Sequence, residues 1–225
     1  MKVIGVVPAF NEEKRITDVL RAYLAYVDEI VVVDDGSNDK TAEAAKIEKV
    51  NVLRHAVNRG QGAALRTGTT AALELGAEVI VHLDADGQHN PKNIPELIKP
   101  LAEGQADVVM GSRFMNLEPS GMPLTRYWLL KAARVFNTMA LGIPKTVTDP
   151  QCGLRAMTAK AARTLDFKQD GFAHASELLR LITRSGLRWR EIPVSISYSQ
   201  ESLGKKVRPD ALRIVWHLFI GVFTK

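Results

Sequence analysis

The sequence predicts an α/β fold, a single domain whose mostly parallel central sheet is flanked by helices. The first half of the chain alternates short apolar runs with helical patterns, which is typical of a doubly wound sheet. The length of 225 residues and the hydrophobic fraction of 46% are enough for one such domain with a sizeable core. Two of the apolar runs end in paired acidic residues, and open α/β sheets bind ligands at the carboxyl ends of their strands.

Five apolar runs predict the strands of the first half. Each run is four or five residues long and is followed by polar or turn-forming residues. They lie at residues 3–7, 29–33, 50–53, 79–83 and 108–111. Strands as apolar as these are normally covered on both faces, so we expect helices above and below the sheet.

Four helices are expected between these strands. They lie at residues 12–26, from Ser37 or Asp39 to Ala45, at residues 60–75 and at residues 93–101. The first has an apolar face formed by Ile16, Val19, Leu20, Tyr23 and Leu24. Ser37 and Asp39 are candidate N-caps of the second helix, and the third opens with glycines.

The alternation stops after Gly111, and no linker separates the second half from the first. We expect a loop, a long helix, a turn with a short strand, a leucine-rich helix, two extended segments divided by Pro193, and a terminal helix. These lie at residues 115–123, 124–141, 148–157, 173–185, 189–198 and 208–223. The second half is therefore expected to be a cap on the same domain, which would cover residues 1–225.

The charge balance is basic, with a net charge of +5, which can indicate nucleic acid, an anionic membrane or phosphorylated ligands. Nucleic acid is disfavoured as a partner, because the chain has no zinc-finger spacing, no aromatic RNA-binding strand and no basic recognition helix. The single cysteine, Cys152, rules out an intramolecular disulfide and suggests a reducing compartment. We therefore expect a cytoplasmic location.

The most informative segment is the apolar run that delivers Asp84 and Asp86 at the end of a strand. Carboxylates in such a place are costly to desolvate unless a positive group joins them. A hard divalent cation, Mg²⁺ or Mn²⁺, that carries a phosphorylated ligand would meet this need. The alternative is a polar turn whose acidic residues cap a helix.

A second acidic pair, Asp34 and Asp35, follows another apolar run. An acid there could bind a ribose hydroxyl or a base N–H, or it could form an Asx-type turn. Residues 58–65 open a helix with small residues, so their backbone N–H groups could approach a phosphate or a base. They lack the lysine of a P-loop, which disfavours a nucleoside triphosphatase.

Taken together, these motifs resemble the family 2 glycosyltransferases of the GT-A fold, and within them the dolichol-phosphate (polyprenyl-phosphate) sugar synthases. The resemblance extends in order from residue 3 to about residue 203. The matching segments are residues 8–13 (PAFNEE), 33–37 (VDDGS) with Asp39 and Thr41, 58–64 (NRGQGAA), 84–89 (DADGQH), 111–114 (GSRF) and 149–155 (DPQCGLR).

The resemblance implies a donor-binding half at residues 1–112 and an acceptor-binding half at residues 113–225. A nucleotide-diphosphate sugar of the GDP-mannose or UDP-glucose type would be held by Pro8, Phe10, Glu12, Asp35, Asp84, Ala85, Gln88 and Arg113. The metal would be bound by Asp84, Asp86 and Gln88. Arg113 would contact a phosphate, and Arg126 would hold the acceptor phosphate of a polyprenyl or dolichyl chain.

For the reaction we expect one in-line displacement that inverts the anomeric carbon. The metal and Arg113 would neutralise the departing nucleoside diphosphate, with Asp86 as a further catalytic residue. An acceptor phosphate is mostly dianionic at neutral pH and needs no general base. It does need cations, and Arg126, Lys131 and Arg134 are the candidates.

A hydroxyl acceptor on a glycan or small molecule is the alternative, and it would require a base. Asp149 is the first candidate for that role and Glu177 the second, although Asp149 could cap a turn and Glu177 could be a structural carboxylate. His82 is expected in the core or behind the site, and His89 could line the metal site. A non-catalytic subunit that only binds nucleotide sugars is a further hypothesis.

Because a polyprenyl acceptor lies in a bilayer, we expect peripheral contact with the cytoplasmic membrane surface. Residues 214–223 are apolar but too short to span a membrane. The cations that precede them could face anionic headgroups; these are Lys205, Lys206, Arg208 and Arg213. This segment could equally pack on the core or form a dimer contact, which leaves the oligomeric state open. Residues 128–130, beside Arg126, offer a second membrane-facing patch.

Overall fold

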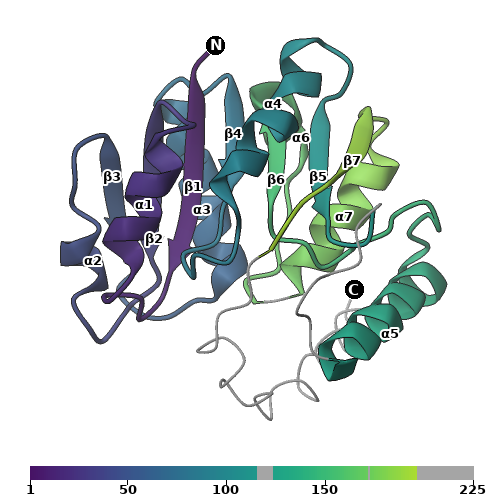
Figure 1. The fold of residues 1–225 in the computed structure, drawn as a ribbon, viewed down its shortest axis with the longest axis horizontal. Coiled ribbons are helices and arrows are strands. Elements are labelled where there is room, and N and C mark those ends of the chain that lie inside the picture. Colours follow the sequence, from purple (N-terminus) through teal and green to yellow (C-terminus); the bar gives the residue numbers. More distant parts are fainter. Residues whose placement is uncertain (116–123, 172, 197–225) are drawn as a thin grey trace.

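Seven strands form one sheet with helices on both faces (Figure 1). The computed structural model describes residues 1–115, 124–171 and 173–196, without the side chains of residues 124–126 and 129. The strands are β1 (Val3–Ala9), β2 (Glu29–Asp34), β3 (Val50–Arg54), β4 (Val79–His82), β5 (Val108–Ser112), β6 (Arg155–Thr158) and β7 (Trp189–Pro193). All five strands expected in the first half are therefore present.

The order across the sheet is β3-β2-β1-β4-β6-β5-β7. The pairs β1–β2, β1–β4, β2–β3 and β5–β7 are parallel. Strand β6 is antiparallel to both of its neighbours, β4 and β5. The mostly parallel sheet expected from the sequence is confirmed, and the second half of the chain supplies two of its strands.

The helices divide between the two faces of the sheet. They are α1 (Ile16–Leu24), α2 (Thr41–Ala44), α3 (Gln61–Glu74), α4 (Ile94–Ala102), α5 (Leu124–Leu141), α6 (Ala159–Thr164) and α7 (His174–Arg184). One core cluster packs α1 and α4 on the sheet, and the other packs α3, α6 and α7 on the opposite face. A short 3₁₀ helix, Pro91–Asn93, leads into α4.

Strand β2 illustrates why the strands are apolar at every position. Its residues Ile30 and Val32 belong to the first cluster, and Val31 and Val33 belong to the second. Successive side chains of a strand point to opposite faces, so a sheet covered on both sides needs an apolar residue at each position. All four are fully buried, which confirms that helices cover both faces.

Helices α1 and α2 begin later than the sequence suggested. The residues that were expected to open them bind one another in turns instead. The backbone N–H of Glu12 donates to Thr41 Oγ1 at 2.8 Å, which holds residues 11–15 in a turn before Ile16. Asp39 Oδ1 accepts the N–H of Thr41 at 3.0 Å, at the start of α2. The Ser37 hydroxyl instead accepts a backbone N–H from the turn after β1.

The sheet changes direction of winding between β1 and β4. The chain passes from β1 outward to β2 and β3, and then returns to place β4 on the other side of β1. A crevice is expected where the carboxyl ends of such strands diverge. Asp84 and Asp86 follow β4, at this crevice.

Several expected features fall outside the described residues. These are residues 116–123 of the loop expected at residues 115–123, the terminal helix at residues 208–223 and the cations Lys205, Lys206, Arg208 and Arg213. Within the described ranges, no helix combines the length and apolarity needed to cross a bilayer.

Candidate functional site

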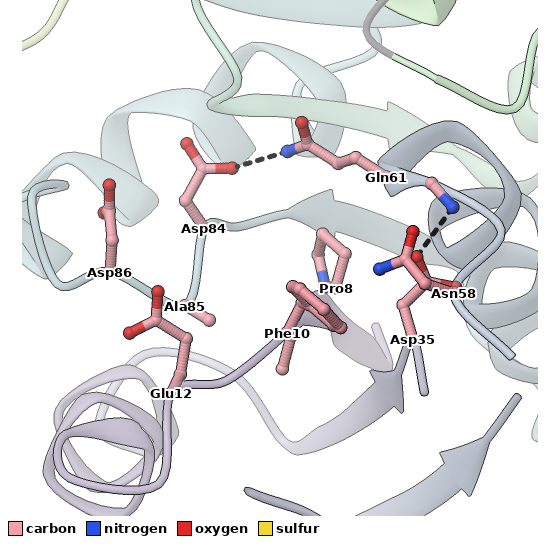
Figure 2. A pocket seen from close by; sticks show the side chains of 11 residues that line it. Pro8, Phe10, Glu12, Asp35, Asn58, Gln61, Asp84, Ala85 and Asp86 are labelled. Atoms are coloured by element: carbon pink, nitrogen blue, oxygen red, sulfur yellow. Dashed lines mark hydrogen bonds between the residues drawn. The ribbon is translucent and has the colours of Figure 1, made fainter. Parts of the chain in front are cut away.

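A cavity of about 490 Å³ lies at the carboxyl ends of β1, β2 and β4 (Figure 2). Its lining is formed by Pro8, Ala9, Phe10, Glu12, Asp35, Asn58, Gly60, Gln61, Asp84, Ala85 and Asp86. Seven of the predicted site residues meet there: Pro8, Phe10, Glu12, Asp35, Asp84, Ala85 and Asp86. Gln88, Arg113 and Asp149 are not part of its lining.

The wall formed by β1 and β2 combines an aromatic ring with a buried carboxylate. Phe10 is 40% exposed and lines the cavity, so part of its side chain is accessible to a ligand. Asp35 is buried, and its carboxylate accepts the backbone N–H groups of Arg59 at 2.9 Å and Gly60 at 2.7 Å. His55 Nδ1 lies 2.7 Å from the same carboxylate.

The contacts of Asp35 correct the expectation for residues 58–65. Two of the N–H groups that were expected to approach a phosphate or base bind Asp35 instead. Gly60 is required for this geometry, because it adopts a positive φ of 102° and an added Cβ would lie 2.4 Å from Asp170 O. This loop therefore positions Asp35, and Asn58 and Gln61 reach the cavity from it.

Asp84 is held from two sides. Its Oδ2 lies 2.7 Å from His89 Nε2, and its Oδ1 accepts the Gln61 side-chain amide at 3.2 Å (Figure 2). Burial raises the pKa of Asp84, but the charge and hydrogen bond of His89 and the charge of Arg155 outweigh it and leave the pKa below its usual value. Asp84 is therefore a carboxylate at neutral pH.

Tyr23 also supports the turn that carries Asp84. Its hydroxyl donates to the backbone carbonyl of Asp84 at 2.9 Å. Burial, together with the charges of Asp84 and Asp86, raises the pKa of Tyr23 far above its usual value. The phenol consequently stays protonated and can act as a permanent donor to this carbonyl.

Asp86 and Glu12 face the same cavity from the turns that follow the neighbouring strands β4 and β1 (Figure 2). The backbone N–H of Gln88 donates to Asp86 Oδ1 at 2.9 Å, so this residue supports Asp86 through its main chain. Arg15 Nε lies 2.8 Å from Glu12 Oε2. Four carboxylates thus border one space, those of Glu12, Asp35, Asp84 and Asp86, and Glu12 carries an ion pair to the residue that precedes α1.

The donor chemistry at Asp84 and Asp86 fits a hard divalent cation. Among the described residues, no group of three or more His, Cys, Asp or Glu side chains is close enough to enclose a metal by itself. Mg²⁺ is commonly held by one or two carboxylates, with waters and substrate phosphates as the other ligands. Two carboxylates at the edge of an open cavity suit that mode of binding.

Arg113 and Asp149 form a buried pair away from this cavity. Arg113 Nε and Nη2 donate to the Asp149 carboxylate at 2.6 and 2.7 Å, and the Arg113 backbone N–H adds a third bond at 3.0 Å. The side chains are 6% and 1% exposed. Both oxygens of Asp149 are therefore engaged, and each of the two predicted site residues holds the other.

The other candidate base and the histidines also have partners. Glu177 Oε2 accepts the backbone N–H groups of Lys168 at 2.9 Å and Gln169 at 2.7 Å, as a structural carboxylate would. His82 is buried, with Nε2 3.0 Å from Thr69 Oγ1, which confirms its expected place in the core. The side chain of Arg126 lies outside the described residues.

Helix α5 carries the other two cations that were expected to bind the acceptor. Lys131 Nζ lies 5.4 Å from the centroid of the Phe114 ring and 5.3 Å from that of Tyr127. Arg134 Nη2 donates to Lys145 O at 2.9 Å. Trp128 on the same helix is 66% exposed.

The sequence did not predict that Tyr23 and Gln61 bind Asp84, or that His55 contacts Asp35. Tyr23 was expected only as one of the apolar residues of its helix, because spacing alone does not reveal which hydroxyl reaches a distant carbonyl. Gln61 follows a glycine at the start of α3, and polar residues at that position were the available signal.

Comparison with known proteins is consistent with this geometry. The model of the family described as glycosyl transferase family 2 matches residues 6–163. An uncharacterized protein of Methanocaldococcus jannaschii is 41% identical over 208 residues, which cover 91% of this chain and 85% of that protein. The UDP-N-acetylglucosamine–dolichyl-phosphate N-acetylglucosaminyltransferase of Methanococcus voltae is 34% identical over 221 residues, with coverages of 89% and 87%.

A solved structure gives the same fold. Glucosyl-3-phosphoglycerate synthase from Mycobacterium tuberculosis, crystallised with Mn²⁺, UDP and glucosyl-3-phosphoglycerate, superposes with a TM-score of 0.74 at 23% identity. The match covers 98% of this chain and 79% of that one. The GT-A fold expected from the sequence is confirmed, and since the family model matches more than half of its residues, the chain belongs to glycosyl transferase family 2.

Proposed function

We propose that this glycosyltransferase moves a hexose from a nucleoside diphosphate sugar to a polyprenyl or dolichyl phosphate, with inversion and with the help of a divalent metal. The observation that carries the proposal is the cavity that joins Phe10 and Asp35 to Asp84 and Asp86. One end of it offers groups suited to a nucleoside, and the other offers carboxylates suited to a metal-bound diphosphate. The relative from Methanococcus voltae is named for a dolichyl-phosphate acceptor, which supports the choice of acceptor.

The donor nucleoside would lie between Pro8, Phe10 and Asp35. An exposed aromatic ring can stack on any base, because every base has a π-face. A carboxylate that already accepts two backbone N–H groups keeps free lone pairs, and it can accept a further hydrogen bond from a base N–H or a ribose hydroxyl. Nothing in this set selects guanine over uracil, so GDP-mannose and UDP-glucose are both candidate donors.

Asp84 and Asp86 would hold the divalent cation, Mg²⁺ or Mn²⁺, with Gln88 on the same turn as an assisting residue. When bound, the cation would supply the positive charge that neutralises the leaving diphosphate. His89 and Gln61 fix the Asp84 carboxylate, so little reorganisation would be needed when the donor arrives.

In the transfer step, an oxygen of the acceptor phosphate forms a bond to the anomeric carbon while the bond from that carbon to the nucleoside diphosphate breaks. The electron pair leaves with the diphosphate, and the anomeric configuration inverts. An acceptor phosphate is already anionic, so this step transfers no proton. Arg113 and Arg126 would hold the phosphate groups, Arg113 while keeping its pair with Asp149.

The engaged carboxylates favour a phosphate acceptor over a hydroxyl. A hydroxyl needs a general base within hydrogen-bond reach of its proton. Asp149 is bound through both oxygens to Arg113, and Glu177 accepts two backbone N–H groups. Each candidate base already binds the chain around it, and neither lines the cavity that would hold the donor.

The test is a transfer assay with the purified chain, Mn²⁺ and a short-chain polyprenyl phosphate, with UDP- and GDP-sugars offered one at a time. We expect one donor to give an acid-labile polyprenyl-phosphate hexose, identified by mass, and EDTA to stop its formation. Transfer only to glycan or small-molecule hydroxyls would contradict the proposed acceptor. Binding of a nucleotide sugar without any transfer would favour a non-catalytic subunit.

The role of the metal ligands is tested by Asp86→Asn, which keeps the shape of the side chain but removes its charge. We expect transfer to fall by at least about a hundredfold, as when an electrostatic catalytic group is removed. The matched control is Asp107→Asn, because Asp107 pairs with Arg188 at the surface, far from the cavity in sequence and in the sheet. Equal losses in the two variants would contradict the assignment of Asp86.

A further inference from the structure

A second, smaller cavity lies behind Asp84, on the side of the sheet that carries α3 and α7. Its volume is about 170 Å³. Asp84 and Gln61 line both this inner cavity and the larger one described above, so the two spaces meet at these side chains. The remaining polar lining comes from His82, Gln151, Arg155 and His174. None of these four was assigned a role in the proposed reaction.

Arg155 is the most unusual residue of the inner cavity. It is only 3% exposed, and within the described ranges no hydrogen bond or ion pair of its side chain is found, although its charge interacts with that of Asp84. It pairs with His82 across β4 and β6, so both side chains point to the α3 and α7 face of the sheet. A buried guanidinium carries five N–H donors, and leaving them unmet is costly. The geometry therefore calls for a ligand rich in acceptor oxygens.

His174 supplies an acceptor to the same cavity. Its Nδ1 lies 2.8 Å from Gly171 O, and since a carbonyl oxygen can only accept, Nδ1 carries the proton and Nε2 has a free lone pair. Burial lowers the pKa of His174 to about 4, so the ring is neutral at pH 7. Gln151, whose amide can both donate and accept, lines the cavity from the loop before β6.

We propose that the inner cavity is the compartment for the donor hexose, and that Arg155, His174 and Gln151 hydrogen-bond its hydroxyl and ring oxygens. This inference rests on the proposed function, in which Asp84 marks the position of the metal-bound diphosphate. The hexose is attached to that diphosphate, so it must lie next to Asp84 on the side away from the nucleoside. Hydroxyl groups both donate and accept, which matches a lining of one cation, one carboxylate, one imidazole acceptor and two amides.

Arg155 and its neighbours would thus recognise the sugar, while Phe10 and Asp35 recognise the nucleoside. The two parts of the donor can be measured separately by comparing UDP with UDP-glucose and GDP with GDP-mannose. Titration calorimetry of the full chain with Mn²⁺ gives both affinities for each variant. The ratio of the affinities for the nucleotide sugar and the nucleoside diphosphate reports the sugar compartment alone.

Arg155→Met is expected to weaken binding of the nucleotide sugar about ten- to hundredfold, the value of one hydrogen bond to a charged group. Binding of the nucleoside diphosphate should stay within about twofold. Arg155→Lys should recover part of the loss, because it restores the charge with fewer donors. The matched control is Arg180→Met, which removes an exposed arginine on α7 and should leave both affinities unchanged.

A second variant does not depend on the fold tolerating the loss of Arg155. Ala175 lines the inner cavity from α7 and is half-buried, so Ala175→Leu fills the space with a good helix former. This variant should weaken binding of the nucleotide sugar and leave binding of the nucleoside diphosphate unchanged. The inference is overturned if both affinities fall together in Arg155→Met and Ala175→Leu, since these residues would then act only through Asp84 or the fold. It is also overturned if neither affinity changes.

The wild-type transfer assay separates this inference from the proposed function. If the chain binds a nucleotide sugar through the inner cavity but transfers nothing to polyprenyl phosphate, the proposed acceptor is wrong and the hexose compartment stands. If transfer occurs and the two variants lose both affinities equally, the proposed acceptor stands and the hexose compartment is wrong. A wild-type chain that binds no nucleotide sugar would overturn both.

Discussion

At the scale of single residues, Asp84 lies where the two cavities of the site meet. It borders both cavities, contacts His89 and Gln61 through its carboxylate, and accepts the Tyr23 hydroxyl through its main chain. Its position in the sequence, after a buried strand and two residues before Asp86, was enough to single it out. Its partners lie on α1, α3 and the turn before α4, and only the folded chain brings them together.

Gly153 limits where the Asp84 carboxylate can lie. A Cβ at this position would be 2.7 Å from Asp84 Oδ2, so Gly153→Ala must displace the carboxylate. We expect transfer to fall at least about tenfold, the effect of misplacing a catalytic group. The melting temperature should change little, because one side chain can rotate away. Steady-state kinetics and thermal unfolding measure the two effects, and a variant with full activity would contradict the constraint.

The buried pair of Arg113 and Asp149 should dominate the stability of its region. Asp149→Ala removes the carboxylate that binds Arg113 through two side-chain bonds, and breaking a buried pair costs about 3–5 kcal/mol. Urea unfolding of this variant should therefore give a large loss in the free energy of unfolding. The exposed pair of Lys168 and Asp166 is the control, because Asp166→Ala should cost at most about 1 kcal/mol. Similar losses in both variants would contradict this view of the pair.

At the scale of elements, the expected strands and helices of the first half were found, with boundaries that moved by a few residues. Apolar runs and helical periodicity are local signals, and they were read correctly here. Helix α6 (Ala159–Thr164) was not expected, because it is short and follows β6 directly. Its signal was Thr158, whose Oγ1 accepts the N–H of Ala161 at 3.1 Å as an N-cap.

Gly68 allows α3 to lie directly on β1. A Cβ there would be 2.5 Å from Val6 Cγ1, a fully buried side chain. Replacing glycine by alanine at an exposed helix position stabilises a protein by up to about 1 kcal/mol. Overpacking a core instead destabilises it by about 1–3 kcal/mol. Gly68→Ala should therefore destabilise the protein in urea unfolding.

Two further variants decide whether that loss comes from the contact with Val6. Thr70→Ala, at an exposed position of the same helix, should leave stability unchanged or slightly higher. The double variant Val6→Ala/Gly68→Ala should show a favourable coupling relative to the two single variants. Additive effects would mean that the close approach is not the cause.

At the scale of the whole molecule, two buried histidines predict how stability depends on pH. Burial, together with the charges of Arg155 and His174, lowers the pKa of His82 from 6.5 to about 3, and burial lowers that of His174 to about 4. Both rings are neutral in the folded state but become charged in the unfolded chain below pH 6.5. The unfolded state then binds more protons, so stability is full above about pH 6.5 and falls as the pH drops toward 4.

Urea unfolding between pH 4 and pH 7 measures this dependence. The free energy of unfolding should decrease steadily below about pH 6.5, and His82→Gln should flatten the decrease. The Thr69 hydroxyl can still bond the glutamine amide, so the variant is expected to fold. An unchanged slope in His82→Gln would mean that other groups cause the acid sensitivity.

The sequence predicted which residues gather at the larger cavity but not how the second half of the chain enters the sheet. Asp35, Asp84 and Asp86 could be placed together because they follow apolar runs predicted to be strands of one parallel sheet. The resemblance to family 2 glycosyltransferases added Pro8 and Phe10. The position of β6 between β4 and β5 depends on pairing between residues far apart in the chain, for which no local pattern gives a signal. The inner cavity was missed for the same reason, since Arg155 and His174 belong to that half.

The placement of β6 has a consequence for synthesis on the ribosome. Strand β5 finds its only neighbours in this sheet, β6 and β7, later in the chain, so its edges are bare when it leaves the exit tunnel. At about 5–20 residues per second, the segment between β5 and β6 takes roughly 2–9 seconds to appear. During that interval a nascent chain exposes an apolar strand, which is the kind of surface that holdase chaperones bind. Ribosome-bound chains stalled before β6 should therefore recruit such chaperones, and chains released after β7 should not.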